Sequence, residues 1–342
     1  MADSLISSTF PPLSNPTVSI LICNYNYGRY LATAIESALN QTYPAINIIV
    51  VDDGSIDNSR EIIEGYGSKI SAIFRANGGQ IAAVNEGLAS CEGELVCVLD
   101  ADDILEPNAL ESASFRFGAD VVKIHFPLAL IDAGGNLLHA TIPRFLEAGA
   151  LSTALRNGRL YGSAPGSGNI YRKSALIPLL PLPEDSEDRH GADYFMLLGI
   201  SMLGDIVAIN TPLARYRVHE RPQSLSFGNA NKRPDSAERR AARLVTWIRA
   251  RLDIDIPLPD LRRDFSLQKI RFANCVLATN SYVDRLKQAP SAISRLIPSI
   301  RAIQGRNMLY KFGLFIWSVI VSVAPRRMAI AAAKYVCSPA AR

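Results

Sequence analysis

Two acidic clusters, each directly after a short apolar run, are the residues of this sequence best suited to chemistry. Asp52-Asp53-Gly54-Ser55 follows the run Asn47–Val51, and Asp100-Ala101-Asp102-Asp103 follows Leu95–Leu99. If both runs are parallel strands, their carboxyl ends meet at one edge of a sheet, where α/β proteins bind ligands. Carboxylates gathered there repel one another unless they share a cation or a hydrogen-bonding ligand. The pattern therefore predicts a Mg²⁺ or Mn²⁺ ion that carries a diphosphate.

An Asp-x-Asp sequence alone is weak evidence, since about one is expected by chance in a chain of this length and composition. Asp253 and Asp255 form such a pair, which follows no strand and precedes Pro257, so we expect a solvated helix end or turn. Asp100 and Asp102 differ, because an apolar run precedes them and a second acidic cluster accompanies them.

The elements that would position these clusters alternate between strands and helices. The predicted strands are short buried runs with turn residues at their ends: Val18–Cys23, Asn47–Val51, Ile70–Phe74 and Leu95–Leu99. The predicted helices are the amphipathic stretches between them: Tyr30–Asn40, Ser59–Gly65 and Ile81–Ser90. This alternation predicts a doubly wound, mostly parallel sheet flanked by helices. A later strand over Val121–Leu130 and a turn at 132–136 predict that the sheet is mixed.

Changes in composition divide the chain into three parts. We expect a flexible polar leader over residues 1–16, a main α/β domain over 17–227 and a helical region over 228–342. The boundary is predicted from a linker-like segment, Asn229–Pro234, and from the Arg-rich helix expected over Ser236–Leu252. The chain shows neither internal repeats nor low-complexity tracts.

The termini and cysteines indicate the compartment. Asp3 stands where a signal peptide would be basic, and no long apolar segment follows it. The five cysteines are scattered without a C-x-x-C pair, as is typical of a reducing compartment. We therefore expect a cytoplasmic protein. The net charge of +4 is too small to argue for nucleic acid as a partner.

The C-terminal tail carries an apolar run between basic residues. Phe312–Ala324 lies between Lys311 and Arg326-Arg327, and it is shorter than the roughly 20 residues that span a bilayer. Met328–Val336 is again apolar. We favour a pair of helices lying on the inner face of the cell membrane, whose anionic lipids would attract the basic flanks. The alternative is that these helices close the main domain or form a dimer contact.

The motifs, taken together, resemble those of family 2 glycosyltransferases. The resemblance covers roughly residues 16–226, and its first half is the more specific. It rests on these segments: Val18–Asn26, Gln41–Pro44, Val51–Asp57, Asn77–Gln80, Asn85–Gly87, Leu99–Asp103, Ala192–Tyr194 and Tyr216–His219. It implies the GT-A fold, with residues 17–227 as the catalytic domain. It also implies inverting transfer of a sugar from a nucleotide donor, most simply a UDP-linked one. The acceptor hydroxyl would belong to a glycan or lipid-linked molecule in cell-surface polysaccharide or glycolipid assembly.

The resemblance implies roles for the residues that bind the donor. Tyr25 and Asp53 would hold the nucleotide base, because an aromatic ring suits its face and a carboxylate accepts its N–H. Tyr25 as a packed core residue and Asp53 as the cap of its own turn are the alternatives. Asp100 would hold the ribose and Asp102 the metal. Asp103 would cap a following helix or make a further polar contact.

Several residues complete the expected donor side. Asn77 and Gln80 would lie along the donor groove. Val84 stands where many relatives carry Arg, so an ionic contact to the donor is expected to be missing. His219 stands where some relatives supply a third metal ligand, although a packed or surface histidine is the alternative. The remaining histidines have no such context and are expected to be structural: His125, His139 and His190.

Transfer to a hydroxyl needs a base that removes its proton. Asp193 is our candidate, although Ala192 replaces the Glu of the usual Glu-Asp pair. Glu187 and Asp188 form an intact pair nearby and are the rivals, unless they belong to a solvated loop.

Two other functions stay open on the sequence. A sugar-nucleotide nucleotidyltransferase shares the sheet type, but its Gly-rich phosphate loop is missing from Asn24–Arg29. A catalytically silent scaffold subunit that binds nucleotide sugars would explain the altered residues Ala192 and Val84.

Overall fold

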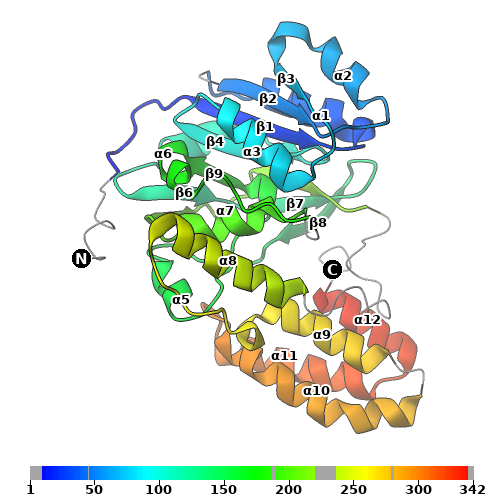
Figure 1. Cartoon of the computed structure of the whole chain (residues 1–342). Coiled ribbons are helices and arrows are strands. Elements are labelled where there is room, and N and C mark those ends of the chain that lie inside the picture. Colours follow the sequence, from blue (N-terminus) through cyan, green and yellow to red (C-terminus); the bar gives the residue numbers. More distant parts are fainter. Residues whose placement is uncertain (1–9, 45, 187–188, 220–235, 279–280, 338–342) are drawn as a thin grey trace. The chain divides into compact units, whose positions relative to one another are not determined.

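A computed structural model describes residues 10–44, 46–186, 189–219, 236–278 and 281–337 (Figure 1). By their contacts the residues form two units. The first holds both sheets and comprises Met1–Leu155, Tyr161–Arg217 and Arg243–Ile256. The second comprises Arg156–Leu160, Val218–Ala242 and Pro257–Arg342. The expected boundary between 227 and 228, with the linker at 229–234, lies outside the described residues and stays a prediction.

The chain begins with the strand–helix alternation that the sequence predicts. Every predicted strand and helix of this part is present, with ends shifted by at most two residues. The elements are β1 (Val18–Asn24), α1 (Gly28–Leu39), β2 (Ile46–Asp52), α2 (Ser59–Gly65), β3 (Ser71–Phe74), α3 (Gln80–Ser90) and β4 (Leu95–Asp100).

A seven-stranded sheet lies at the centre of the first unit, in the order β10-β6-β9-β4-β1-β2-β3. Its remaining strands are β6 (Val121–His125), β9 (Asn169–Arg172) and β10 (Asp205–Ala208). Neighbouring strands are parallel, except that β9 runs antiparallel to both β4 and β6. The predicted doubly wound, mixed and mostly parallel sheet is therefore confirmed.

The first unit also contains a smaller sheet of four strands, in the order β5-β11-β7-β8. Its strands are β5 (Ile104–Leu105), β7 (Leu128–Ile131), β8 (Leu137–Ile142) and β11 (Ala214–Arg217). The single strand expected over Val121–Leu130 is wrong, because β6 and β7 belong to different sheets. Pro127 lies between them, and without an N–H it cannot continue a ladder. The predicted turn is confirmed, since Asp132 and Asn136 close it by hydrogen bonds.

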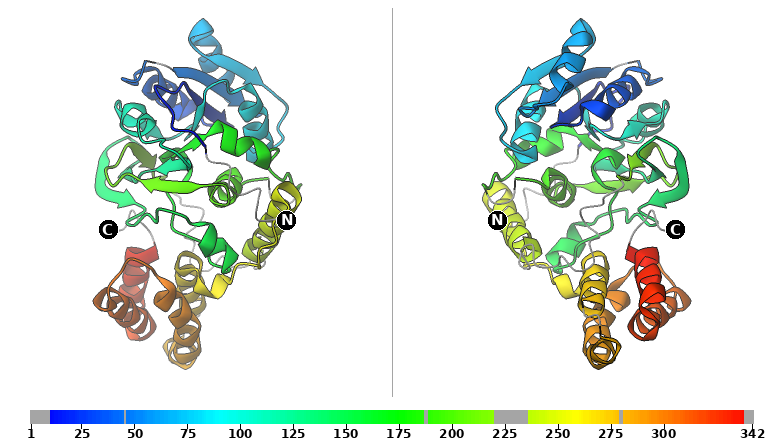
Figure 2. Two further views of the ribbon diagram at one scale, coloured as in Figure 1. Left: turned by 90° about the vertical axis from the view of Figure 1, so that its left-hand side faces the viewer. Right: turned by 90° about the vertical axis from the view of Figure 1, so that its right-hand side faces the viewer.

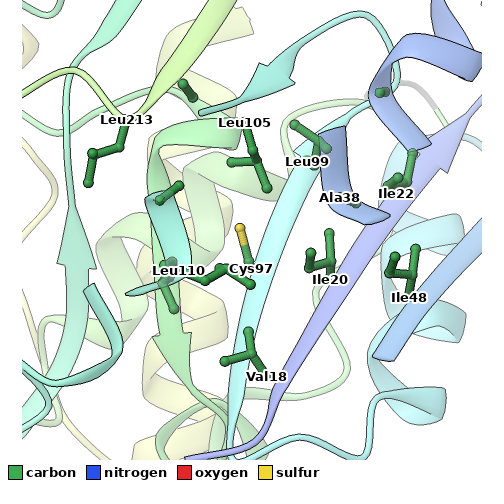
Figure 3. Close-up of a cluster of buried hydrophobic side chains, with 14 of the residues drawn as sticks. Val18, Ile20, Ile22, Ala38, Ile48, Cys97, Leu99, Leu105, Leu110 and Leu213 are labelled. Atoms are coloured by element: carbon green, nitrogen blue, oxygen red, sulfur yellow. The ribbon is translucent and has the colours of Figure 1, made fainter. Parts of the chain in front are cut away.

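The main core lies between the large sheet and its helices (Figure 3). β1 pairs with β4 on one side and β2 on the other, and its first five residues are wholly buried. Apolar residues of α1 recur with the spacing of one helix face and pack into the same cluster: Leu31, Ala34, Ile35 and Ala38. This packing fixes the carboxyl ends of β1, β2 and β4 relative to one another.

Shorter helices complete the first unit. They are α4 (Ala109–Ser114), α5 (Ser152–Arg156), α6 (Lys173–Leu176) and α7 (Ala192–Ile200). The predicted Arg-rich helix is confirmed as α8 (Ser236–Leu252). In its second half, Trp247 packs edge-on against Phe195 of α7, with 5.7 Å between the ring centroids.

Residues 10–16 differ from the flexible leader expected over 1–16. The Leu13 N–H donates to the carbonyl of Phe117, and the Tyr43 hydroxyl donates to the carbonyl of Pro16. The buried guanidinium of Arg172 donates to the carbonyl of Pro11 at 2.8 Å. These bonds hold the described part of the leader against the first unit.

The second unit is mostly helical (Figure 2). It contains α9 (Phe265–Leu277), α10 (Tyr282–Ala302), α11 (Met308–Val323) and α12 (Arg326–Cys337). The two apolar runs of the tail are therefore a pair of helices, α11 and α12, as predicted. Phe272 and Trp317 meet in the core of this unit, with ring centroids 5.4 Å apart. No helix in the described ranges is both long and apolar enough to cross a bilayer.

Candidate active site

A cavity of about 520 Å³ opens at the carboxyl ends of β1, β2 and β4. This is the sheet edge at which the sequence predicts that the two acidic clusters meet, and both contribute to the wall. The residues lining it are Cys23, Asn24, Tyr25, Tyr27, Asp53, Asn77, Gly79, Gln80, Ala83, Asp100, Ala101, Asp102, Arg189, His190 and Tyr216.

Six of the predicted site residues line this one cavity: Tyr25, Asp53, Asn77, Gln80, Asp100 and Asp102. Tyr25 is 45% exposed, so its alternative as a packed core residue is wrong. Tyr27 and Tyr216 add two more aromatic rings to the wall. Burial and the nearby Asp carboxylates raise the pKa of Tyr27, and they raise the pKa of Tyr216 to about 12. Both phenols therefore stay protonated at neutral pH and are able to donate hydrogen bonds.

The carboxylates of Asp52 and Asp53 form hydrogen bonds with different loops. Asp52 is buried and holds its own turn, because its carboxylate accepts from Asn24 at 2.8 Å and from the hydroxyl of Ser55. Asp53 instead holds the loop before α3. Its carboxylate accepts the N–H groups of Gly78 at 2.8 Å and Gly79 at 2.7 Å. The alternative that Asp53 caps its own turn is therefore wrong.

Two ion pairs connect Asp53 with Glu86 through Arg75. The Arg75 guanidinium pairs with the Asp53 carboxylate and, through Nε, with Glu86 at 2.7 Å. Asp53 thus accepts three donors, and a carboxylate has about four acceptor positions. These donors leave one acceptor position unused, and Asp53 is among the residues lining the cavity.

Two glycines let the loops around Asp53 approach closely. Gly54 has φ +75°, and a Cβ there would lie 2.7 Å from the backbone nitrogen of Asn77. Gly79 has φ +92°, and a Cβ there would lie 2.6 Å from Cβ of Arg189. A side chain at either position would be strained and would push the loops apart.

Of the three carboxylates at the end of β4 and just after it, one has a structural role and two face the cavity. Asp103 is buried and accepts from the Ser167 hydroxyl at 2.6 Å and the Arg217 N–H at 3.0 Å. It makes the further polar contact that was one of its two expected roles, whereas Asn108 is the residue at the N-cap of α4. Asp103 therefore ties the loop after β4 to β11, and Asp100 and Asp102 face the cavity.

The electrostatics at Asp100 favour a bound cation. Burial, reinforced by the carboxylates of Asp102 and Asp193, raises the pKa of Asp100 to about 7. Among the described residues, no group of three or more His, Cys, Asp or Glu side chains is arranged to hold a metal. Mg²⁺ is commonly held by one or two carboxylates together with phosphate oxygens of the substrate. Asp100 and Asp102 are the carboxylates of this cavity that would hold such a cation together with a diphosphate.

Arg189 is one of the residues of this cavity that no sequence motif indicates. Its guanidinium donates to the carbonyls of Gly78 at 2.9 Å and Asn77 at 2.7 Å, and to Oδ1 of Asn77 at 2.8 Å. Val84 is buried in α3, and Arg189 contributes a guanidinium to the cavity wall from the loop before α7. His190, expected to be structural, also lines the cavity.

The expected acceptor-side residues have different places. Asp193 lies in the first turn of α7 and lines a small recess that it shares with Gln80 and Asp100. The Gly191 N–H donates to Oε1 of Gln80 at 2.8 Å, which joins the start of α7 to the start of α3. Glu187 and Asp188 lie outside the described residues. His219 is described but is not among the residues lining the cavity, so its role as a metal ligand stays a prediction.

A solved structure of the same architecture identifies the fold. The mannosyltransferase PcManGT of Pyrobaculum calidifontis, solved with GDP-Man and Mn²⁺, aligns with a TM-score of 0.52 at 18% identity. The alignment covers 97% of this chain and 87% of the mannosyltransferase. The fold is therefore of the GT-A type, as predicted.

Sequence comparison then gives the family. The model of glycosyl transferase family 2 matches residues 19–160. An uncharacterised glycosyltransferase of Nostoc sp. is 36% identical over 226 residues, which are 64% of this chain and 70% of that protein. The putative glycosyltransferase EpsH of Bacillus subtilis is 30% identical over 216 residues, 60% of this chain and 62% of EpsH. The chain belongs to glycosyltransferase family 2.

Proposed function

We propose that this glycosyltransferase moves a sugar, with inversion, from a UDP-linked donor to a hydroxyl of a glycan or lipid-linked acceptor, using Mg²⁺ or Mn²⁺. The observation that carries the proposal is the meeting of Asp53, Asp100 and Asp102 with Tyr25 in one cavity. Polysaccharide or glycolipid assembly at the inner face of the membrane is the proposed setting. The GDP-Man and Mn²⁺ held by the mannosyltransferase of the same fold support the ligand class.

The base and ribose of the donor occupy the side of the cavity formed by β1 and β2. The exposed ring of Tyr25 lies against the face of the base. Asp53 accepts the N–H of the base at the acceptor position that its three protein donors leave open. Asn77 and Gln80 line the groove beside it, and Asp100 accepts hydrogen bonds from the ribose hydroxyls.

The diphosphate lies between carboxylate and guanidinium groups. Asp102, together with Asp100, would hold the divalent cation, which when bound neutralises charge on the leaving diphosphate. Arg189 donates to phosphate oxygens, for which a guanidinium fork is well suited. The protonated phenols of Tyr27 and Tyr216 supply further donors.

Asp193 acts as the general base, with Glu187 and Asp188 as rivals outside the described residues. The acceptor O–H proton passes to the Asp193 carboxylate while the acceptor oxygen forms its bond to the anomeric carbon. The bond from that carbon to the phosphate oxygen breaks, and the nucleoside diphosphate leaves with the bonding electron pair. The position of Asp193 in a recess shared with Asp100 and Gln80 supports this role.

Donor hydrolysis tests the proposal. The full chain is incubated with a panel of UDP- and GDP-sugars, with Mn²⁺, with Mg²⁺ or with chelator, and nucleoside diphosphate release is measured. We expect one sugar to be preferred and chelator to abolish release. Absence of both turnover and nucleoside diphosphate binding would defeat the proposal, and tight binding without turnover would favour the scaffold subunit.

A further inference from the structure

A second cavity, within the helical unit, is lined by five basic side chains. It measures about 460 Å³, and its basic residues are Arg159, Arg263, Arg301, Arg306 and Lys311. The rest of its wall is residues 302–305, which include no acidic residue. Five cations around one cavity repel one another unless an anion lies among them. The charge of the wall therefore indicates an anionic ligand.

The cavity is built by the turn from α10 to α11. Gly305, with φ +69°, reverses the chain, and the Asn307 side chain caps α11 by accepting the Tyr310 N–H at 2.9 Å. Lys311 donates from Nζ to the carbonyl of Arg301 at 2.9 Å, which closes the turn. Neither Arg263 nor Arg301 has a described carboxylate within ion-pairing distance, although the charge of Arg263 helps to lower the pKa of Asp260, which pairs with Arg262. The positive charge of this wall is therefore only partly balanced by described acidic groups.

Exposed apolar side chains follow this cavity directly. Met308, Leu309 and Phe312 begin α11, and they are 78%, 77% and 59% exposed. The Arg306 guanidinium lies 5.1 Å from the centroid of the Tyr310 ring, so the basic and apolar groups are interleaved. This combination matches the boundary between headgroups and acyl chains of a bilayer, where cations meet phosphate and apolar groups enter hydrocarbon.

The charge of the chain is also divided along its length. Residues 257–342 contain 14 Lys and Arg, three Asp and no Glu, a formal charge of +11, whereas residues 1–256 carry −7. A second copy of the same helices would bring the same positive charge and would be repelled. An anionic membrane would be attracted, at about 1 kcal/mol for each basic residue near its surface.

We infer that the cavity of Arg159, Arg263, Arg301, Arg306 and Lys311 binds the phosphate group of an anionic phospholipid, with the first turn of α11 inserted beside it. This site deepens the proposed membrane contact by naming the residues and the lipid class. It places a phosphate in the cavity and the side chains of Met308, Leu309 and Phe312 among the acyl chains.

Vesicle flotation with the full chain tests the inference. The vesicles are phosphatidylcholine alone or mixed with phosphatidylglycerol. The test variant is Arg263→Gln with Arg301→Gln, and the matched control is Lys287→Gln with Arg327→Gln, which removes the same charge from exposed positions outside the cavity. A second pair compares Phe312→Ser with Ile177→Ser, an equally exposed apolar residue of the first unit.

We expect the chain to bind the anionic vesicles only. The cavity variant should bind them roughly tenfold to thirtyfold more weakly than the unaltered chain, and its control less than about threefold more weakly. Phe312→Ser should weaken binding, and Ile177→Ser should not. Equal weakening by both double variants would overturn the inference, because the attraction would then be spread over the surface. The inference would also be overturned if the chain bound no vesicles, or if an added DNA duplex displaced it from the anionic vesicles. Self-association through this face would overturn it as well.

Donor hydrolysis in solution separates this inference from the proposed function. The cavity variant should hydrolyse the donor as the unaltered chain does. A chain that binds anionic vesicles but hydrolyses no donor defeats the proposed function alone, and the converse result defeats the lipid site alone.

Discussion

Asp102 and Asp100 are the cavity carboxylates best placed for a cation, since Asp103 is engaged by Ser167 and Arg217. Asp102→Asn keeps the shape of the side chain and removes its charge. We expect kcat for donor hydrolysis to fall by on the order of 100-fold or more, because charge on the leaving diphosphate loses its cation. Steady-state kinetics across a Mn²⁺ titration would measure it.

The control for this change is Asp205→Asn at the exposed start of β10. It should leave kcat unchanged. An Asp102→Asn variant with full activity and an unaltered Mn²⁺ requirement would remove Asp102 from the proposed cation site.

Arg189 offers a second prediction, because its guanidinium both lines the cavity and fastens the loop before α3. Arg189→Lys keeps the charge but loses the planar fork that reaches Asn77 and Gly78 together. We expect the Kd for nucleoside diphosphate to rise about tenfold in Arg189→Lys and further in Arg189→Gln. Isothermal titration calorimetry would measure both values. If Arg189→Gln binds as tightly as the unaltered chain, the guanidinium does not contact the diphosphate.

The start of α3 depends on the backbone of Gly79. Gly79→Ala would place a Cβ 2.6 Å from Arg189 at φ +92°, so we expect it to lower the free energy of unfolding by about 1–3 kcal/mol. Gly65→Ala at the end of α2 meets nothing within 4 Å and should not lower it. Urea denaturation compares the two. Equal urea midpoints for the two variants would show that the loop before α3 rearranges without loss of stability.

Strand β6 carries a buried histidine whose titration affects stability. Burial, together with the neighbouring Lys123, lowers the pKa of His125 to about 2, and its Nδ1 lies 3.1 Å from the Ser163 hydroxyl. In the unfolded chain a histidine titrates near pH 6.5. Between these two pKa values, the histidine is protonated in the unfolded chain and neutral in the folded chain. The free energy of unfolding therefore falls as the pH drops below about 6.5.

Comparing pH 7.5 with pH 5.5, we therefore expect this histidine to remove about 1 kcal/mol of unfolding free energy at the lower pH. His125→Asn should lose less on acidification than the unaltered chain, as urea midpoints at the two pH values would show. An equal loss in both proteins would mean that His125 is not the responsible group.

At the scale of elements, the local pattern of apolar residues was sufficient to predict the strands and helices of the alternating part of the chain. The apolar runs ending at Asn24, Asp52 and Asp100 are strands, and parallel strands bring such ends together whatever their separation in sequence. The break at Pro127 was missed, because the apolar residues on both sides of it continue the same pattern although they enter different sheets.

Contacts between distant loops could not be predicted. Arg189 lies 112 residues from Asn77, in a loop without periodicity, so nothing local marks it as part of the site. The only signal was its place just before the Ala192–Asp193 motif. Similarly, the hydrogen bonds from Gly78 and Gly79 to Asp53 could not be predicted, because these glycines belong to a loop that no pattern connects with Asp53.

For the whole molecule, the division of charge between residues 1–256 and 257–342 predicts a salt response that differs between activities. Binding to anionic vesicles should weaken steeply as NaCl is raised, since exposed charges are screened. Donor hydrolysis should change much less, because its charges lie within a partly enclosed cavity. Measurements of both from 50 to about 500 mM NaCl test this. Salt-independent vesicle binding would show that apolar insertion alone holds the protein to lipid.

The hydrogen bonds that join the loop before α3 to the loop before α7 have a consequence for the speed of binding. Asp53, Arg189 and Gln80 engage protein groups of these loops, so we expect hydrogen bonds within the protein to be sufficient to form this wall of the cavity. An incoming nucleotide need not wait for the wall to form. Stopped-flow traces should therefore show a single phase whose observed rate rises linearly with nucleotide concentration, without a plateau.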